Sequence, residues 1–187
     1  MANRTCDCLG CGWGLLGVVL ILGAGVAAQA GPEAGRPDPA QRRMAVLEIV
    51  RRKPADGLPR LAVAMQDDNA VVRRAAVRGL REWGAPARDA LAAALSDSDG
   101  VVRLTAFQAL DEQQALTVEQ IAAACSDREN ASLRHCAVQA AARFPASAET
   151  RALLEKAVKD ESEAVRAIAS KALYPFPFFR KVESVRD

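Results

Sequence analysis

The chain has 187 residues and a formal net charge of +2, a balance that by itself points to no class of partner. Its only histidine is His135, and it contains neither a glycine-rich phosphate loop nor a set of zinc ligands. Acid–base and nucleophilic catalysis need several converging polar groups, usually including His. We therefore expect no catalytic residues, no metal and no cofactor.

The first 30 residues have the pattern of an export signal. Arg4 supplies a positive charge, residues 15–22 are an apolar run, and Ala28-Gln29-Ala30 fits a cleavage site. This pattern predicts a cleaved signal and an exported chain, either periplasmic or secreted. The alternative is an uncleaved membrane anchor over residues 13–30, although that uncharged stretch is only marginally long enough to span a bilayer.

Three of the five cysteines, Cys6, Cys8 and Cys11, precede the apolar run and are expected to leave with the signal. Residues 31–39 are rich in Pro and Gly, which predicts a short disordered leader. A repeat domain is expected to follow over residues 40–174.

A single helix over residues 41–52 is expected to open that domain. Its Arg43, Val46, Ile49 and Val50 align with residues 30 positions further along the chain, in the second helix of the first repeat. It should therefore cover the apolar face of that repeat, as a terminal cap must.

From residue 58 the same helical hairpin recurs with a period near 30 residues. In each second helix the order V-R-x-x-A-x-x-(A/G)-L places the small and apolar residues on one face. In the second repeat this spacing predicts a buried seam that contains Leu91, Val102, Ala106 and Leu110. A fixed period of this length indicates stacked repeats with a continuous core.

An Asp closes each hairpin, and an Arg follows near the start of each second helix. These pairs are Asp67 and Arg73, Asp97 and Arg103, Asp127 and Arg134, and Asp160 and Arg166. Because one residue type recurs in every unit, we expect a structural ladder in which each guanidinium binds loop carbonyls or the Asp of an adjacent unit. The Asp should also accept hydrogen bonds from backbone N–H groups at the start of the second helix.

The pattern Asp-x-x-x-x-Val-Arg-x-x-Ala-x-x-Ala-Leu resembles the HEAT-like repeat, in particular the short version named after phycobilisome lyases. The resemblance covers about residues 58–173, and Trp83-Gly84-Ala85-Pro86-Ala87 is similar to that family's turn between repeats. It implies an all-α, right-handed α-solenoid of about four hairpins plus the cap helix, used for binding proteins. HEAT-like iron hydroxylases carry several His-Glu pairs that this chain lacks, and export argues against a phycobilin lyase.

The third repeat is irregular and holds the two remaining cysteines. Residues 128–131 are expected to bulge, because this loop is one residue longer than in the first repeat. Cys125 and Cys136 fall on the two helices of one hairpin. They are either a disulfide, which an exported protein can keep, or two small thiols that fill core space.

Positive charge is concentrated in the first part of the repeat domain. Residues 42–88 have 11 Lys and Arg against five Asp and Glu, whereas residues 89–187 have 12 against 15. Arg74, Arg78 and Arg81 share one face of their helix. They either form an anionic partner site on the concave surface or are a solvated face.

The aromatic tail, residues 175–187, contains two prolines that forbid a helix there. It either covers the open end of the last hairpin or docks on a partner. Taken together, the sequence predicts a non-catalytic scaffold that binds a protein partner and no nucleic acid. The partner is expected to be acidic if Arg74, Arg78 and Arg81 form its site. The alternative is an accessory, lyase-like component that handles a small ligand in the groove.

Overall fold

The computed structural model describes residues 36–144 and 147–174, and its helices belong to one compact unit, residues 37–187. The predicted export signal or anchor, the three cysteines within it, most of the leader and the aromatic tail lie outside the described residues. None of the described helices has the length and apolar character needed to cross a bilayer.

One helix followed by four helical hairpins makes up the described part of the chain. The first helices of the hairpins are α2 (Gly57–Ala64), α4 (Arg88–Ala94), α6 (Val118–Cys125) and α8 (Ala148–Ala157). The second helices are α3 (Ala70–Trp83), α5 (Gly100–Glu112), α7 (Ala131–Ala141) and α9 (Glu163–Leu173), and α1 (Pro39–Arg52) stands before them. A short 3-10 turn, Ala85–Ala87, precedes α4. The predicted all-α solenoid with a cap helix is confirmed.

The second helices of the first three hairpins begin after a capping residue that recurs in the sequence two or three positions after the ladder Asp. The side chain of Asn69 accepts a hydrogen bond from the N–H of Val71, and Asp99 accepts from Val101 and Val102. In the irregular third repeat the extra loop residue moves this role to Asn130. These side chains satisfy N–H groups that have no partner within the helix.

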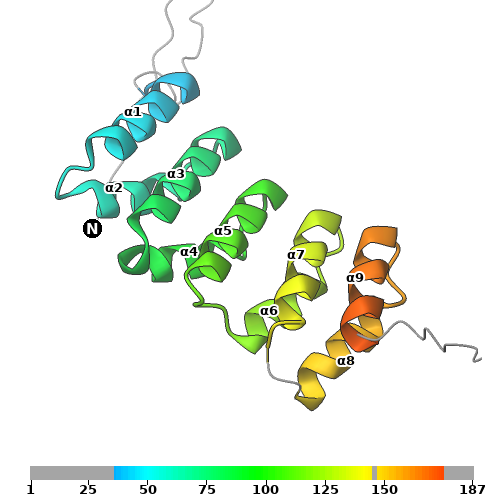
Figure 1. Ribbon diagram of the computed structural model, residues 1–187. Helices are drawn as coiled ribbons and strands as arrows, with labels where there is room; N and C mark the ends of the chain where they lie inside the picture. Colours follow the sequence, from blue (N-terminus) through cyan, green and yellow to red (C-terminus); the bar gives the residue numbers. More distant parts are fainter. Residues whose placement is uncertain (1–35, 145–146, 175–187) are drawn as a thin grey trace, which may run out of the picture. The chain divides into compact units, whose positions relative to one another are not determined.

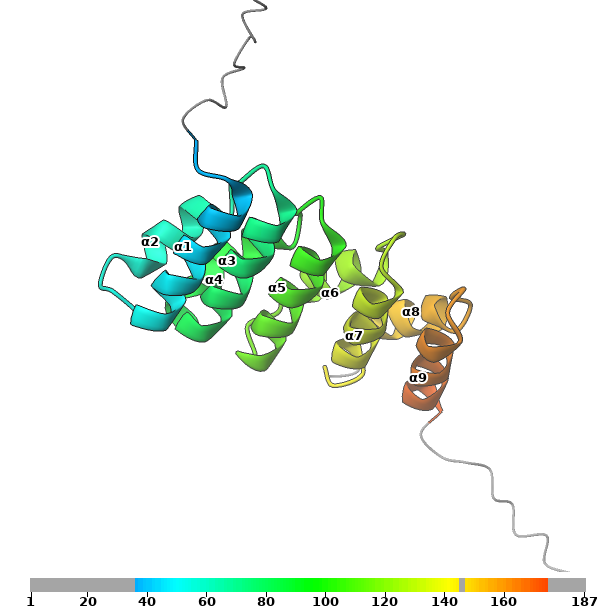
Figure 2. The same ribbon diagram turned by 90° about the horizontal axis from the view of Figure 1, so that it is seen from above.

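The helices form two layers, which Figures 1 and 2 show from two directions. The helices α1, α3, α5, α7 and α9 stand side by side in chain order, and each is in contact with the next. The first helices form the second layer, and each packs against the second helix of its own hairpin. We call the exposed surface of α1, α3, α5, α7 and α9 the second-helix face.

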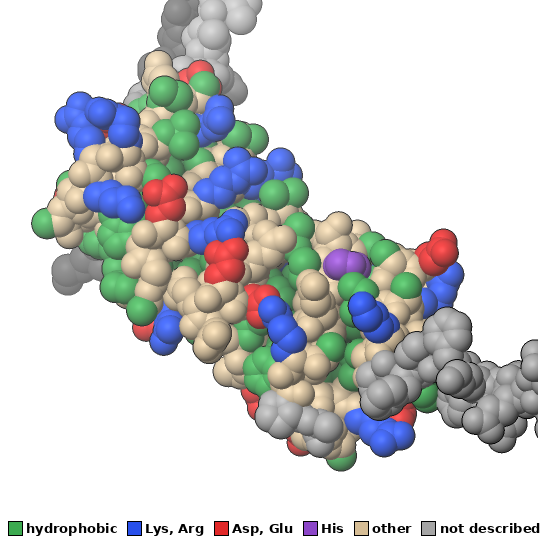
Figure 3. Space-filling model, viewed as in Figure 1, with side chains coloured by type: hydrophobic (Ala, Val, Ile, Leu, Met, Phe, Trp, Pro, Cys, Tyr) green, Lys and Arg blue, Asp and Glu red, His purple; other side chains and the backbone are tan. Residues whose placement is uncertain are grey.

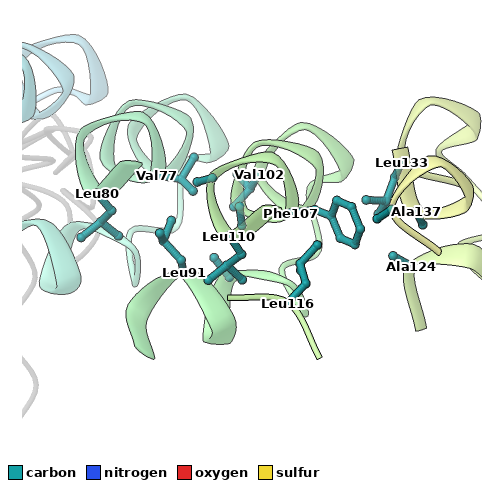
Figure 4. Packing of buried hydrophobic residues seen from close by; sticks show 14 of the residues in the cluster. Val77, Leu80, Leu91, Val102, Phe107, Leu110, Leu116, Ala124, Leu133 and Ala137 are labelled. Carbon is teal, nitrogen blue, oxygen red and sulfur yellow. The ribbon is translucent and has the colours of Figure 1, made fainter. Parts of the chain in front are cut away.

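A continuous core lies between the layers. The predicted seam residues of the second repeat are buried, because Leu91, Val102 and Ala106 have no exposed surface and Leu110 has 1%. Figure 4 shows Leu91 between the helices that carry Leu80 and Leu110. The core prediction for this repeat is confirmed.

Close approach of neighbouring helices explains the small residue in each second helix. A Cβ atom added to Gly79 would lie 2.6 Å from Cγ2 of Val50 in α1 and 3.1 Å from Cδ1 of Leu61 in α2. Only a residue without a side chain lets α3 approach both helices at this point.

Candidate functional site

The Asp and Arg residues that recur in each repeat form a ladder of hydrogen bonds that join successive repeats. In Arg73, Nε and Nη2 donate to Oδ2 and Oδ1 of Asp97, each at 2.9 Å. Its Nη1 donates to the carbonyl oxygens of Asp67 at 2.8 Å and Asp68 at 3.1 Å. Arg73 therefore holds its own loop and the next one together.

The other rungs repeat this geometry. Nε of Arg103 lies 2.7 Å from Oδ2 of Asp127, and Nε of Arg134 lies 2.8 Å from Oδ2 of Asp160. The first rung is formed by Arg42 of α1, whose Nε lies 2.7 Å from Oδ2 of Asp67. The alignment at an offset of 30 was wrong for Arg43, because Arg42 forms the rung and Arg43 is exposed. It was right for Val46 and Ile49, which are buried.

These rungs are buried at the edge of the solenoid. The side chains of Arg134 and Asp160 expose 11% and 13% of their surface. The hydrogen bond from Arg134 holds the pKa of Asp160 below its usual value, and the same bond raises the pKa of Arg134. Asp160 also accepts a hydrogen bond from the N–H of Ser162 at 2.8 Å. Polar groups satisfied in this way stabilise the stacking of repeats and have little left to offer a partner.

The three arginines of the predicted anionic site lie on α3, but they are not equivalent. Arg74 donates from Nε and Nη2 to the carboxylate of Asp99 at 2.9 and 2.6 Å. Arg81 forms an ion pair with Glu112 of α5. Arg78 is exposed, and no described residue forms an ion pair or hydrogen bond with it.

The acidic partners of Arg74 and Arg81 were not identified from the sequence. Asp99 follows Arg74 by 25 residues, close to the spacing of 24 between Arg73 and Asp97, so extending the ladder spacing by one residue would have found it. The hydrogen bond from Arg74 lowers the pKa of Asp99 to about 2. Two of the three arginines thus carry charge that the next repeat already balances.

Figure 3 shows how charge is distributed over the second-helix face. Lys and Arg side chains gather over α1 and α3, where Arg43 and Arg78 are both exposed. His135 lies on α7 and is half-buried. Among the described residues no three His, Cys, Asp or Glu side chains are grouped so that they could hold a metal ion.

Cys125 and Cys136 are both free thiols, so the structure does not support the disulfide hypothesis. Cys125 faces α8, where it lines a hollow with Leu153 and Lys156. Cys136 faces α5 instead, with its Sγ 3.9 Å from Nε2 of Gln108. The two side chains lie on different sides of their hairpin, and burial raises the pKa of the Cys125 thiol to about 11.

A series of hollows lies between successive first helices. The largest, about 810 Å³, lies between α6 and α8 beside the ladder residues Asp127, Arg134 and Asp160. Two smaller ones, of about 300 and 280 Å³, lie between α2 and α4 and between α4 and α6. Hollows along the first helices and exposed charge along the second helices thus both occur on the described surface. A further hollow, of about 520 Å³, lies by the C-terminal ends of α5 and α7, beside Glu112, Leu116 and Arg143.

Comparison with known proteins gives a match for the first part of the chain. The family model described as HEAT repeats matches residues 30–111, which include α1 to α4 and all of α5 except Glu112. The later hairpins continue the same helix order and the same ladder. No curated protein matches the chain.

Proposed function

Because this chain contains HEAT repeats, we propose that it is an exported, non-catalytic scaffold that binds a protein partner on the second-helix face. Proteins with such repeats commonly serve as protein-interaction scaffolds. The partner surface is expected to present acidic groups to α1 and α3.

One observation carries this proposal: Arg78 is exposed on the second-helix face beside arginines that are already paired. The ladder arginines are buried between repeats, and Arg74 and Arg81 bind acids of the next repeat. Arg78, together with Arg43 on the adjacent α1, therefore presents positive charge that the fold does not use. An exposed, unneutralised cation steers an acidic partner toward the surface that carries it.

Arg78→Glu is expected to slow association with the partner by about three- to tenfold at low salt, because steering by charge acts mainly on the association rate. The partner is first captured from the cell envelope of the protein's own host, and binding rates are then measured at two salt concentrations. The difference between parent and variant should shrink at the higher salt, since exposed charges are screened there.

Arg128→Glu is the matched control, because Arg128 is an exposed arginine on a loop between α6 and α7, away from the second-helix face. It should leave the association rate unchanged. Charge reversal at Arg74 or Arg81 is a poorer test, because it would also set two like charges against each other across the repeats. Equal loss of binding from Arg78→Glu and Arg128→Glu would remove the second-helix face from consideration.

Export is the second part of the proposal, and it rests on the sequence of residues 1–30. Mass spectrometry of the protein from its native host is expected to give an N-terminus at or near Gly31. Recovery of protein that retains Met1 from the membrane fraction would instead establish the anchor.

The alternative, an accessory component that handles a small ligand, would place that ligand in the hollow between α6 and α8. That hollow is the largest of those described above, and Arg128 contributes to its lining. Purification of the protein with a bound chromophore would favour this alternative, and a loss of that chromophore in Arg128→Glu would locate it.

A further inference from the structure

The last arginine of the ladder is held in the same way as the others but has no carboxylate to bind. Nη1 of Arg166 donates to the carbonyl oxygens of Asp160 and Glu161, both at 2.8 Å. This is the pose of Arg73, whose Nη1 binds the two equivalent carbonyls while Nε and Nη2 bind an Asp of the next repeat. No described residue accepts a hydrogen bond from Nε or Nη2 of Arg166. Nε and Nη2, the two donors that could bind a carboxylate side by side, are thus held in place without an acceptor among the described residues.

The end face of α9 also differs from the equivalent faces inside the solenoid. Four residues after the ladder Arg, the first three repeats have Val77, Phe107 and Val138, all almost completely buried. The fourth has the half-buried Ser170. Seven residues after the ladder Arg, the half-buried Leu173 replaces the fully buried Leu80 of the first repeat. A polar residue at the centre of the face disfavours another hairpin there, while an open guanidinium and an apolar side chain remain at its two ends.

The segment that follows α9 in the sequence has the complementary groups at a matching spacing. Arg166 and Leu173 are seven residues apart on a helix, or about 10 Å at 1.5 Å per residue. In residues 175–187, Phe179 and Glu183 are four residues apart, or about 12 Å in an extended, proline-type conformation. Pro175 and Pro177 favour an extended conformation only at the start of this segment, up to residue 177. A chain that turns back after Tyr174 would therefore bring Phe179 near Leu173 and Glu183 near Arg166.

Two other occupants fit less well. A second copy of this chain stacked on α9 would need an acid about six residues before its first ladder arginine, Arg42, but Arg36 stands there. Like charges would then meet at the contact. Asp187, the other acid of the tail, is eight residues from Phe179, about 25 Å when extended, which is more than twice the distance to be matched.

We propose that residues 175–187 fold back along α9 and that Glu183 fills the last rung of the ladder, accepting hydrogen bonds from Nε and Nη2 of Arg166. The tail then acts as the C-terminal cap of the solenoid, with its aromatic residues over Leu173. Because the segment is covalently attached at Tyr174, its effective concentration at α9 is high. This inference does not depend on the proposed partner site.

Chymotrypsin cleavage after Phe178 and Phe179 tests the proposal on the full chain, with products followed by mass spectrometry. Glu183→Gln is expected to speed cleavage at these bonds by about fivefold, because proteolysis tracks the population of the open segment. The matched control, Asp187→Asn, should be cleaved at the parent rate. Combining Arg166→Gln with Glu183→Gln should speed cleavage no more than either change alone, because both remove the same contact.

Two results would overturn the proposal. Equal cleavage rates in the parent and Glu183→Gln would show that Glu183 does not hold the tail, and Arg166 would then be open to a carboxylate of another protein. Protection that rises with protein concentration would assign the rung to the tail of a second copy. Far-UV circular dichroism of Glu183→Gln and Asp187→Asn should match the parent, since both residues lie outside the described helices.

Discussion

Leu91→Ala is expected to lower the free energy of unfolding by about 2–5 kcal/mol, the range for a large-to-small change in a packed core. Leu91 has no exposed surface, and Figure 4 shows it between α3 and α5. Because α4 has only seven residues, few other side chains of this helix can fill the space that the leucine leaves. Chemical denaturation of the parent and the variant measures the difference.

Ala106→Arg should cost more than Leu91→Ala. It would force a long, charged side chain into a position with no exposed surface, which adds overpacking to the burial of an unpaired charge. Val63→Ala is the control, because Val63 is 73% exposed and its loss should change stability by less than about 0.5 kcal/mol. If all three variants unfolded at the denaturant concentration of the parent, the assignment of helix faces would be wrong.

Asp160→Ala is expected to destabilise the protein by about 3 kcal/mol, because removal of one member of a buried ion pair leaves the other without a counter-charge. Arg134 would lose its two hydrogen bonds to the carboxylate, at 2.8 and 2.9 Å, and Ser162 would lose the acceptor of its N–H. Glu161→Ala is the neighbouring control, since Glu161 is exposed and only its backbone carbonyl takes part in the ladder. Unfolding of the two variants at the same denaturant concentration would contradict a stabilising role for this rung.

The same carboxylates should make stability depend on pH in the acid range. The pKa of Asp160 is lowered in the folded protein by its hydrogen bond with Arg134, and that of Asp99 is lowered to about 2 by Arg74. A lowered folded pKa means that this stabilisation is fully present above the unfolded value, about 3.9 for Asp. It is lost as the pH falls through the folded value. Stability of the parent should therefore decline between about pH 4 and pH 2, and Asp160→Ala should decline less.

The arrangement of charges also bears on how the repeats are joined. Each hairpin carries a carboxylate that binds an arginine of the repeat or helix before it, so these pairs stabilise the junctions between repeats. Arg74 and Arg81 add further junctions on the second-helix face, to Asp99 and Glu112. Residues left out of these pairs, such as Arg78, can be changed without breaking a junction, which is why they suit tests of binding.

The sequence by itself determined the repeat, the helices and the buried side of each helix. Helix periodicity is a local property, so the spacing of Val102, Ala106 and Leu110 was enough to place them in the core. The recurrence of Asp and Arg at a fixed spacing likewise marked the residues that meet at the junctions. The ladder Asp was also expected to accept hydrogen bonds at the start of the second helix. It accepts from the N–H of the capping residue, Asn69 or Asp99, whose own side chain caps the helix.

Only the tertiary structure decided which side chains meet across repeats. Such contacts depend on the rotation and offset between neighbouring hairpins, which leave no periodic signal within one helix. The two residues that form a rung are accordingly 25, 24, 24 and 26 positions apart at the four junctions. For this reason Arg42 and not Arg43 forms the first rung, and Arg74 and Arg81 are paired while Arg78 is not. For the same reason Cys125 faces α8 and Cys136 faces α5, although both lie on one hairpin. The free Nε and Nη2 of Arg166 are likewise recognised only in the structure. At every earlier rung the next repeat supplies an Asp, and no described residue does so for Arg166.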